Sequence, residues 1–367
     1  SRASVFENMT RSLDLSDEVA SLFFVVPSLC AFLSSMAIER FLDRLSSVFI
    51  LRLGLVCMGA AFTLFGLTGQ FSLILVEAVL FGVGFGLVSV AQNVAVSESS
   101  DSPDLQRSLF AGLHSMYALA SLMSPLLAGF LFRLQLNWSE IFLVCAVLPA
   151  CVLGATSLLN FEKPSETQSA KTSDVGPSHK SQDLEVFPLK HALFFSVAMS
   201  VYLIAEISVS SRLVVYVRRE LSISDELATR YLAAFFLFLF LGRLGFVFFN
   251  FAKVQTHKLM YVSLLGACVL YTVGLVVTPW LMSLSGLFMA PFFPLVMDYA
   301  VRVFHRFSSR VIAFCMAFAS LSVVFMHYGL GAMSDRVGLA SALWVGPAAL
   351  VICLSMFLIE RRLYHRV

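Results

Sequence analysis

Leu13-Asp-Leu-Ser-Asp-Glu-Val-Ala20 recurs 208 residues farther along the chain as Leu221-Ser-Ile-Ser-Asp-Glu-Leu-Ala228. Each copy leads into a long apolar segment, and at the same offset Phe62-Thr-Leu-Phe-Gly-Leu67 matches Leu270-Tyr-Thr-Val-Gly-Leu275. Self-similarity at a fixed offset indicates an internal repeat, so we expect two related halves. An apolar segment precedes the second copy but not the first, from which we expect one further span upstream of Ser1.

The composition is typical of a protein that crosses the membrane many times. Hydrophobic residues make up 59% of the chain and charged residues 13%, whereas a soluble domain has about 25% charged residues. Apolar runs of roughly 20 residues recur along the chain, and that length spans a hydrocarbon core of about 30 Å as a helix. We therefore expect an all-α membrane protein.

The apolar runs predict eleven spans of an expected twelve. They lie at about 19–38, 48–69, 73–96, 108–132, 140–160, 190–216, 228–250, 258–278, 281–302, 309–333 and 341–359. The segment 161–188 is rich in Ser, Lys, Asp, Glu and Pro, a composition typical of a flexible linker. We thus expect an N-terminal helical bundle over residues 1–160, with spans 2–6, and a C-terminal bundle over 189–367, with spans 7–12.

The loop charges predict the orientation. Most of the 25 lysines and arginines fall in one alternating set of loops, which includes Arg40, Arg44, Arg107, the linker lysines, Lys253, Lys258, Arg302, Arg306, Arg310, Arg361, Arg362 and Arg366. Cytoplasmic loops carry the excess of Lys and Arg, so we expect this set and the C-terminus to be cytoplasmic. The expected location is the cell membrane (inner or plasma membrane), crossed many times.

No pattern indicates an enzyme or a metal centre. The seven cysteines lie in apolar segments without metal-ligand spacing and are interpreted as packing residues. Gly82, Gly84 and Gly86 are too closely spaced for a dinucleotide loop and predict close helix packing instead. No Walker loop or Ser/His/Asp set is present. We expect no catalytic residue, no metal, no cofactor and no nucleic-acid partner.

Six plus six spans in parallel halves, joined by a cytoplasmic linker, resemble the major facilitator superfamily. The loop after the first visible span supports this resemblance: Glu39-Arg-Phe-Leu-Asp-Arg-Leu-Ser-Ser47 keeps Arg40, Asp43 and Arg44 of the superfamily's charged motif, with Glu39 and Ser46 in place of two glycines. The resemblance implies a gating role for this loop; a plain positive-inside loop is the alternative. In the span 108–132, small residues resemble the glycine-rich fifth-span motif, which implies close packing across the interface between halves: Ala111, Ala120, Ser124, Ala128 and Gly129.

A narrower resemblance is to the fucose–galactose–glucose proton symporter branch. Tyr202-Leu-Ile-Ala-Glu206 and Leu241-Gly-Arg-Leu244 look like motifs of that branch, and Ala290-Pro-Phe-Phe-Pro294 also fits. The resemblance implies proton-coupled transport of a sugar.

Charged residues inside the spans are the candidates for a site, because placing one at the centre of a membrane helix costs roughly 2.5–3.5 kcal/mol on insertion scales. Glu206 lies near mid-span with Tyr202 one turn before it on the same face. We expect Glu206 to couple protons or bind solute; the alternative is a structural hydrogen bond between helices. Glu77 is a second candidate for proton coupling, and the alternative is that it snorkels to the outer surface.

Other polar residues complete the predicted site. Candidates for solute binding, besides Tyr202 and Glu206, are His114, Tyr117, His327, Tyr328, Gln92 and Asn93; packing histidines and capping amides are the alternatives. Arg243 and Asp298 both lie toward the inner ends of their spans, so they are assigned to gating and interpreted as an ion pair.

The sequence thus predicts a monomeric secondary active transporter in the lipid bilayer. It would move a small polar solute, such as a sugar, together with protons by alternating access. Two alternatives stay open: a proton-coupled exporter of drugs or metabolites, which the 36 phenylalanines favour, and a receptor or scaffold that has lost transport.

Overall fold

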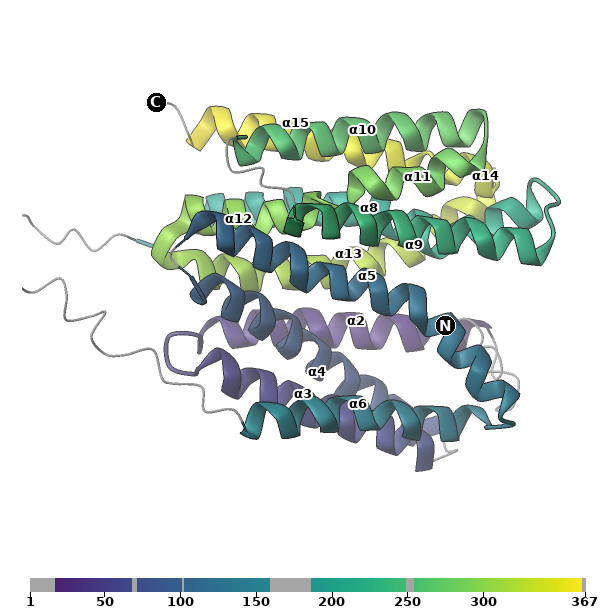
Figure 1. The fold of residues 1–367 in the computed structure, drawn as a ribbon, viewed down its shortest axis with the longest axis horizontal. Helices are drawn as coiled ribbons and strands as arrows, with labels where there is room; N and C mark the ends of the chain where they lie inside the picture. The colour runs from purple at the N-terminus through teal and green to yellow at the C-terminus, as the bar shows by residue number, and fades with distance from the viewer. Residues whose placement is uncertain (1–16, 68–70, 101, 159–185, 249–253, 365–367) are drawn as a thin grey trace, which may run out of the picture.

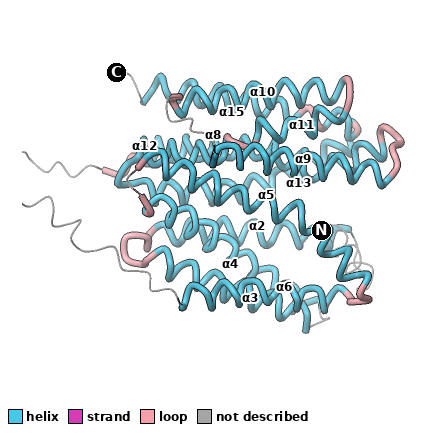
Figure 2. Tube along the Cα trace, in the orientation of Figure 1, coloured by secondary structure: helices cyan, strands magenta, loops and turns pink. Residues whose placement is uncertain are grey.

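The computed structural model describes residues 17–67, 71–100, 102–158, 186–248 and 254–364 of the chain, and in these ranges the regular structure is helical throughout (Figure 2). The helices before the linker are α2 (Asp17–Glu39), α3 (Ser47–Leu67), α4 (Phe71–Glu98), α5 (Pro103–Arg133) and α6 (Trp138–Leu158). Those after it are α8 (Leu189–Arg219), α9 (Asp225–Phe248), α10 (Thr256–Val276), α11 (Pro279–Met289), α12 (Phe292–Phe304), a 3-10 turn (His305–Phe307), α13 (Ser308–Val337), α14 (Leu339–Ala342) and α15 (Val345–Tyr364).

The helices are long and apolar enough to cross a membrane. Ten apolar helical stretches reach that length in the described residues, and one of them, Pro279–Val337, has 59 residues. At about 1.5 Å per residue this stretch is far longer than one crossing, and it turns back at the 3-10 turn before α13. Counted as two, it brings the described spans to the expected eleven. Helices satisfy their own backbone groups, which is what a membrane interior without water requires.

The first five helices and the later ones form two bundles that lie one above the other in Figure 1. Between the bundles, α2 packs on α13 and α5 packs on α9. The sequence repeat relates α2 to α9, and by the same order it relates α5 to α13. The two contacts are therefore equivalent under the symmetry of the repeat.

Within the described ranges, the loops with the predicted cytoplasmic charge lie at one end of the molecule, on the left of Figure 1. This end holds the turn between α2 and α3, the start of α5, the turn between α12 and α13 and the end of α15. We call it the basic end.

Close packing at glycine was predicted for α4 and is confirmed. A β-carbon on Gly84 would lie 2.7 Å from the carbonyl oxygen of Gly54, and one on Gly54 would lie 2.9 Å from that of Gly84. Only glycine at both positions lets the backbones of α3 and α4 approach this closely.

An apolar cavity of about 450 Å³ separates α5 from α2, α3 and α6. Ala120, Ser124 and Ala128 line it. For Ala120, Ser124 and Ala128 the prediction of packing across the interface between halves is therefore wrong, because their side of α5 faces its own bundle. In the second half α8 fills the equivalent place, packed on α13 and α15, whereas no helix of the described residues does so in the first half. Residues 1–16, and any further span before them, lie outside the described residues.

Candidate functional site

The centre of the candidate site is a break in one span. The span expected at 281–302 is divided into α11 and α12 at Ala290 and Pro291. Proline has no N–H and its ring disturbs the preceding turn, so carbonyl groups before it lose their helical partners. Inside a membrane such groups need other donors.

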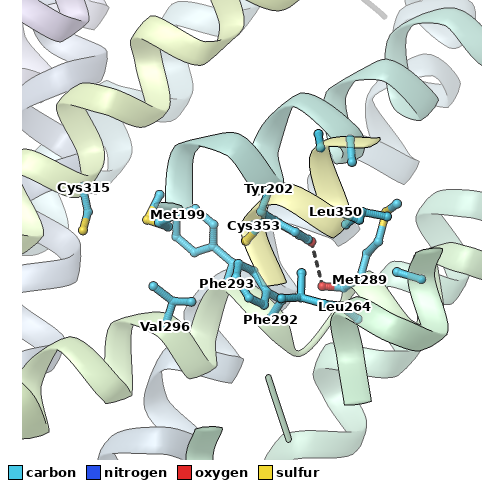
Figure 3. Close-up of a cluster of buried hydrophobic side chains, with 14 of the residues drawn as sticks. Met199, Tyr202, Leu264, Met289, Phe292, Phe293, Val296, Cys315, Leu350 and Cys353 are labelled. Atoms are coloured by element: carbon cyan, nitrogen blue, oxygen red, sulfur yellow. Dashed lines mark hydrogen bonds between the residues drawn. The ribbon is translucent and has the colours of Figure 1, made fainter. Parts of the chain in front are cut away.

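Side chains from three different helices supply those donors. The carbonyl of Phe288 accepts from the Ser263 hydroxyl of α10, that of Met289 accepts from the Tyr202 hydroxyl of α8 at 2.7 Å, and that of Ala290 accepts from Nε of Arg243 on α9 at 3.2 Å. Figure 3 shows the bond from Tyr202 to Met289. The break is thus held open and enclosed by α8, α9 and α10.

Glu206 lies beside the break, in contact with both Tyr202 and Arg243. Oε2 of Glu206 is 2.6 Å from the Tyr202 hydroxyl oxygen, and Oε1 is 3.4 Å from Nη2 of Arg243. Tyr202 and Glu206, which the sequence placed one turn apart on the same helix face, are thus in direct contact. Both side chains are buried in the second half, where a carboxylate needs a proton or a cationic partner.

Arg243 connects this group to the first half. Its Nη1 donates to the backbone oxygen of His114 on α5 at 3.0 Å, and the guanidinium lies over the ring of Tyr117 at 5.8 Å. Gly242 makes this possible: a β-carbon there would lie 2.8 Å from the carbonyl oxygen of Leu287, so only glycine lets α9 come so close to the break.

The first half contributes His114 and Asn93. Nε2 of His114 lies 3.2 Å from Oδ1 of Asn93, and the Asn93 amide reaches Sδ of Met316 on α13 at 3.5 Å. The ring of His114 also packs on Phe293, at the start of α12, with centroids 4.5 Å apart. Six predicted site residues are therefore in one connected group: Tyr202, Glu206, His114, Asn93, Tyr117 and Arg243.

Other predicted site residues lie elsewhere. His327 contacts Phe24 of α2 at the far end from the basic loops, and Tyr328 is largely exposed on the outside of α13. Gln92, the residue before Asn93 in α4, is half-buried. Glu77 is fully buried in α4, so the alternative that it snorkels to the outer surface is wrong.

Two ionic contacts join the halves at the basic end. Asp298 of α12 contacts Nε of Arg107 on α5 at 3.3 Å, Thr256 of α10 at 3.0 Å, and Arg302 on its own helix at 2.9 Å. Nη2 of Arg107 also donates to Thr256 at 2.8 Å. We call this group the α5–α12 clamp. The interpretation that Arg243 and Asp298 form an ion pair is wrong: the bundle packing gives them different partners.

The second contact involves the loop after α2. Arg310, in the first turn of α13, reaches Oδ2 of Asp43 at 2.5 Å and Oε1 of Glu39 at 3.6 Å. Arg40 and Arg44 are exposed beside it. Arg107 and Arg310 were counted in the sequence only as positive loop residues, and no local signal distinguished them. In the described residues, no group of three His, Cys, Asp or Glu side chains could hold a metal ion.

Comparison with known proteins places this geometry among transporters. The sequence matches the family model of the Major Facilitator Superfamily over residues 3–314. The structure is similar to that of the E. coli fucose:proton symporter FucP, with a TM-score of 0.74 at 13% identity over 97% of this chain and 95% of that chain. It is also similar to the proton:xylose symporter XylE, with a TM-score of 0.76 at 12% identity over 98% and 91% of the two chains.

A third similar structure is that of the human organic anion transporter MFSD10, with a TM-score of 0.69 at 12% identity over 96% of this chain and 88% of that chain. At these identities the likeness is one of fold. The search of curated proteins found no match.

Proposed function

Because the chain belongs to the major facilitator superfamily and is thus a membrane transporter, we propose that it moves a small polar solute, such as a sugar, in symport with protons. Glu206 is the proton carrier in this proposal. Two of the similar structures, FucP and XylE, are those of proton symporters of sugars.

The contacts of the Tyr202 hydroxyl support a proton on Glu206. This hydroxyl has a single hydrogen, yet its oxygen lies 2.6 Å from a carboxyl oxygen of Glu206 and 2.7 Å from the carbonyl oxygen of Met289. If Glu206 is protonated, it donates to Tyr202, and Tyr202 donates to Met289. If Glu206 is ionised, the single hydrogen of Tyr202 can serve only one of the two oxygen–oxygen contacts, and the other contact then has no hydrogen between its two oxygen atoms.

The ionised state of Glu206 also has a partner. Arg243 lies 3.4 Å from the other carboxyl oxygen and can approach it as a charge partner. Glu206 therefore has one arrangement that suits the acid and one that suits the carboxylate. A carrier needs both, since it must bind and release the proton in each cycle.

The position of the group suits alternating access. His114, Asn93 and Arg243 meet where the two halves touch, and the ionic contacts between halves lie at the basic end. Opening at that end would break the contacts of Arg107 with Asp298 and of Arg310 with Asp43, while rocking of one half on the other would expose the central group. A single chain supplies both halves, so we expect a monomer to suffice.

Its lysines and arginines assign the basic end to the cytoplasm. The C-terminus is then on the cytoplasmic side of the cell membrane. A single cysteine at Trp344 and one at Arg362, in variants without the seven native cysteines, test this assignment. An impermeant thiol reagent added to intact cells should label the first and not the second. The reverse pattern would contradict the orientation.

The decisive experiment compares Glu206→Gln with the parent in proteoliposomes, using radiolabelled fucose, xylose and glucose as probes. The variant should exchange labelled for unlabelled sugar but fail to accumulate sugar under an imposed proton gradient. Glu226→Gln is the matched control, because Glu226 is exposed and pairs with Arg230 on the surface. Accumulation by Glu206→Gln at the parent rate would contradict the proposal, and no transport of any sugar probe by the parent would favour the exporter, receptor or scaffold.

A proton-coupled exporter of drugs or metabolites is the second candidate. The 36 phenylalanines favour it, and some of them lie on one apolar surface between α5 and the rest of the first half, among them Phe23, Phe62, Phe65, Phe81 and Phe142. An exporter should extrude a fluorescent lipophilic cation from energised vesicles, and Phe62→Ala should weaken this extrusion.

A further inference from the structure

A buried histidine–carboxylate pair lies in the second half, separate from the central group. Nε2 of His191, in the first turn of α8, is 2.7 Å from Oε1 of Glu360, near the end of α15. The hydroxyl of Tyr299 on α12 donates to the other carboxyl oxygen at 3.2 Å. Glu360 is fully buried and His191 is 8% exposed, so three helices meet on a pair that barely reaches the solution at the basic end.

Aromatic rings enclose the imidazole. The ring of Tyr364 stacks on it with centroids 3.7 Å apart and planes 4° apart, and Phe304 packs at 4.5 Å. Other titratable or charged groups face the pair from the packed helices: Tyr261 of α10, which contacts Arg361, and Arg361 itself on α15. Arg310 of α13 lies over Phe187, one turn before His191.

The chemistry of the pair is that of a proton site. Removing an isolated carboxylate from water is costly, and a buried carboxylate is normally paired or protonated. One proton held between His191 and Glu360 makes the pair neutral overall, whichever side chain carries it. Histidine is the side chain that ordinarily changes its charge between pH 5 and 8.

The pair is connected to the contact between halves by adjacent residues. Asp298 faces Arg107 in the α5–α12 clamp, and Tyr299, the next residue of α12, donates to Glu360. Because α12 follows the break at Pro291, it is a short separate helix. The α5–α12 clamp contacts α12 through Asp298, and the His191–Glu360 pair contacts it through Tyr299.

We propose that His191 and Glu360 form a second proton-binding site near the basic end, whose proton release loosens α12 and promotes opening of the transporter at that end. This inference rests on the transport function proposed above but not on Glu206 as the proton carrier.

The direction of the effect follows from charge. With the proton present, imidazolium and carboxylate attract each other and α8, α12 and α15 are held together. When the proton leaves, that attraction is lost and a negative charge stays in a nearly dry site, which favours entry of water and separation of the helix ends. Higher pH at the basic end should therefore increase the open population there.

The test measures that opening directly. Spin labels at Ser99→Cys and Val254→Cys, one in each half at the basic end, report the distance between the halves in nanodiscs of a variant without the seven native cysteines. Between pH 6 and 8 the ratio of open to closed molecules should rise, by at most about tenfold per pH unit if one proton leaves per opening. His191→Gln and Glu360→Gln should each abolish this dependence.

Three further variants separate the possible outcomes. Tyr299→Phe keeps the pair but removes its bond to α12, and it should also abolish the pH dependence. His305→Gln, at an exposed histidine of the same end, should leave it unchanged. Added to Glu206→Gln, His191→Gln should remove the pH dependence that remains, whether or not Glu206 couples protons. If His191→Gln and Glu360→Gln are folded and keep the parent's pH dependence, or if the parent closes as pH rises, the inference is overturned.

Discussion

Asp298→Asn should shift the transporter toward the state that is open at the basic end. The buried carboxylate of Asp298 contacts Arg107 of the other half, but its remaining partners belong to its own half: Thr256 on α10 and Arg302 on α12. Contacts within one half persist when the halves rock apart. Of the three contacts of Asp298, only the one with Arg107 is expected to break when the halves separate at the basic end.

The size of the shift follows from that single contact. A hydrogen bond to a charged group contributes about 1.5–3 kcal/mol, and about 1.4 kcal/mol changes an equilibrium tenfold. Asp298→Asn should therefore raise the ratio of open to closed molecules by roughly 10- to 150-fold. Arg107→Gln should have a similar effect, and the double variant should add little to either change.

The distance between spin labels at Ser99→Cys and Val254→Cys measures this ratio. Arg302→Gln is the matched control, because it removes a partner of the same carboxylate without crossing between the halves, and it should not increase the open population. Additive effects of Asp298→Asn and Arg107→Gln, with no coupling between them, would refute the reasoning. So would an open population in Arg302→Gln equal to that in Asp298→Asn.

Two further predictions concern the loop after α2 and the packing at the central group. Asp43→Asn should change the same ratio by no more than about fivefold, because Asp43 is largely exposed and exposed pairs contribute about 0–1 kcal/mol; its solute affinity should equal the parent's, and a large loss of affinity with normal turnover would contradict a gating role. Gly242→Ala should lower stability by about 1–3 kcal/mol through overpacking against Leu287 and Ala290. Thermal unfolding measures this loss, and Gly129→Ala, where the structure has open space, is the control that should be near neutral.

The local features of the sequence predicted the local features of the structure. Apolar runs fixed the spans because a helix in lipid needs a continuous length of apolar residues. Tyr202 and Glu206 were expected on one face of their helix because they are four residues apart, and in the structure they are hydrogen-bonded. Gly84 indicated close packing, and the backbone of α3 lies against it. Each inference needed only neighbouring residues and the helical period.

The broken span was only partly visible in the sequence. Ala290-Pro-Phe-Phe-Pro294 marks a place where a helix is disturbed, but the run was long enough to be predicted as a single span. The partners of the freed carbonyl groups (Ser263, Tyr202 and Arg243) come from three other helices, and no spacing in the sequence connects them to Pro291.

What the sequence by itself determined is therefore the class of the molecule: a helical membrane protein with two related halves, a charged loop after the first visible span, and a carboxylate near mid-span in the second half. The tertiary structure decided the partners. Arg243 meets Glu206 instead of Asp298, Arg107 joins the halves, Glu77 is buried, and His191 meets Glu360 across 169 residues. The physical reason is that the rotation of each helix and the choice of its neighbours depend on how all the helices pack together, and hydropathy along one helix carries no information about the face that another helix presents to it.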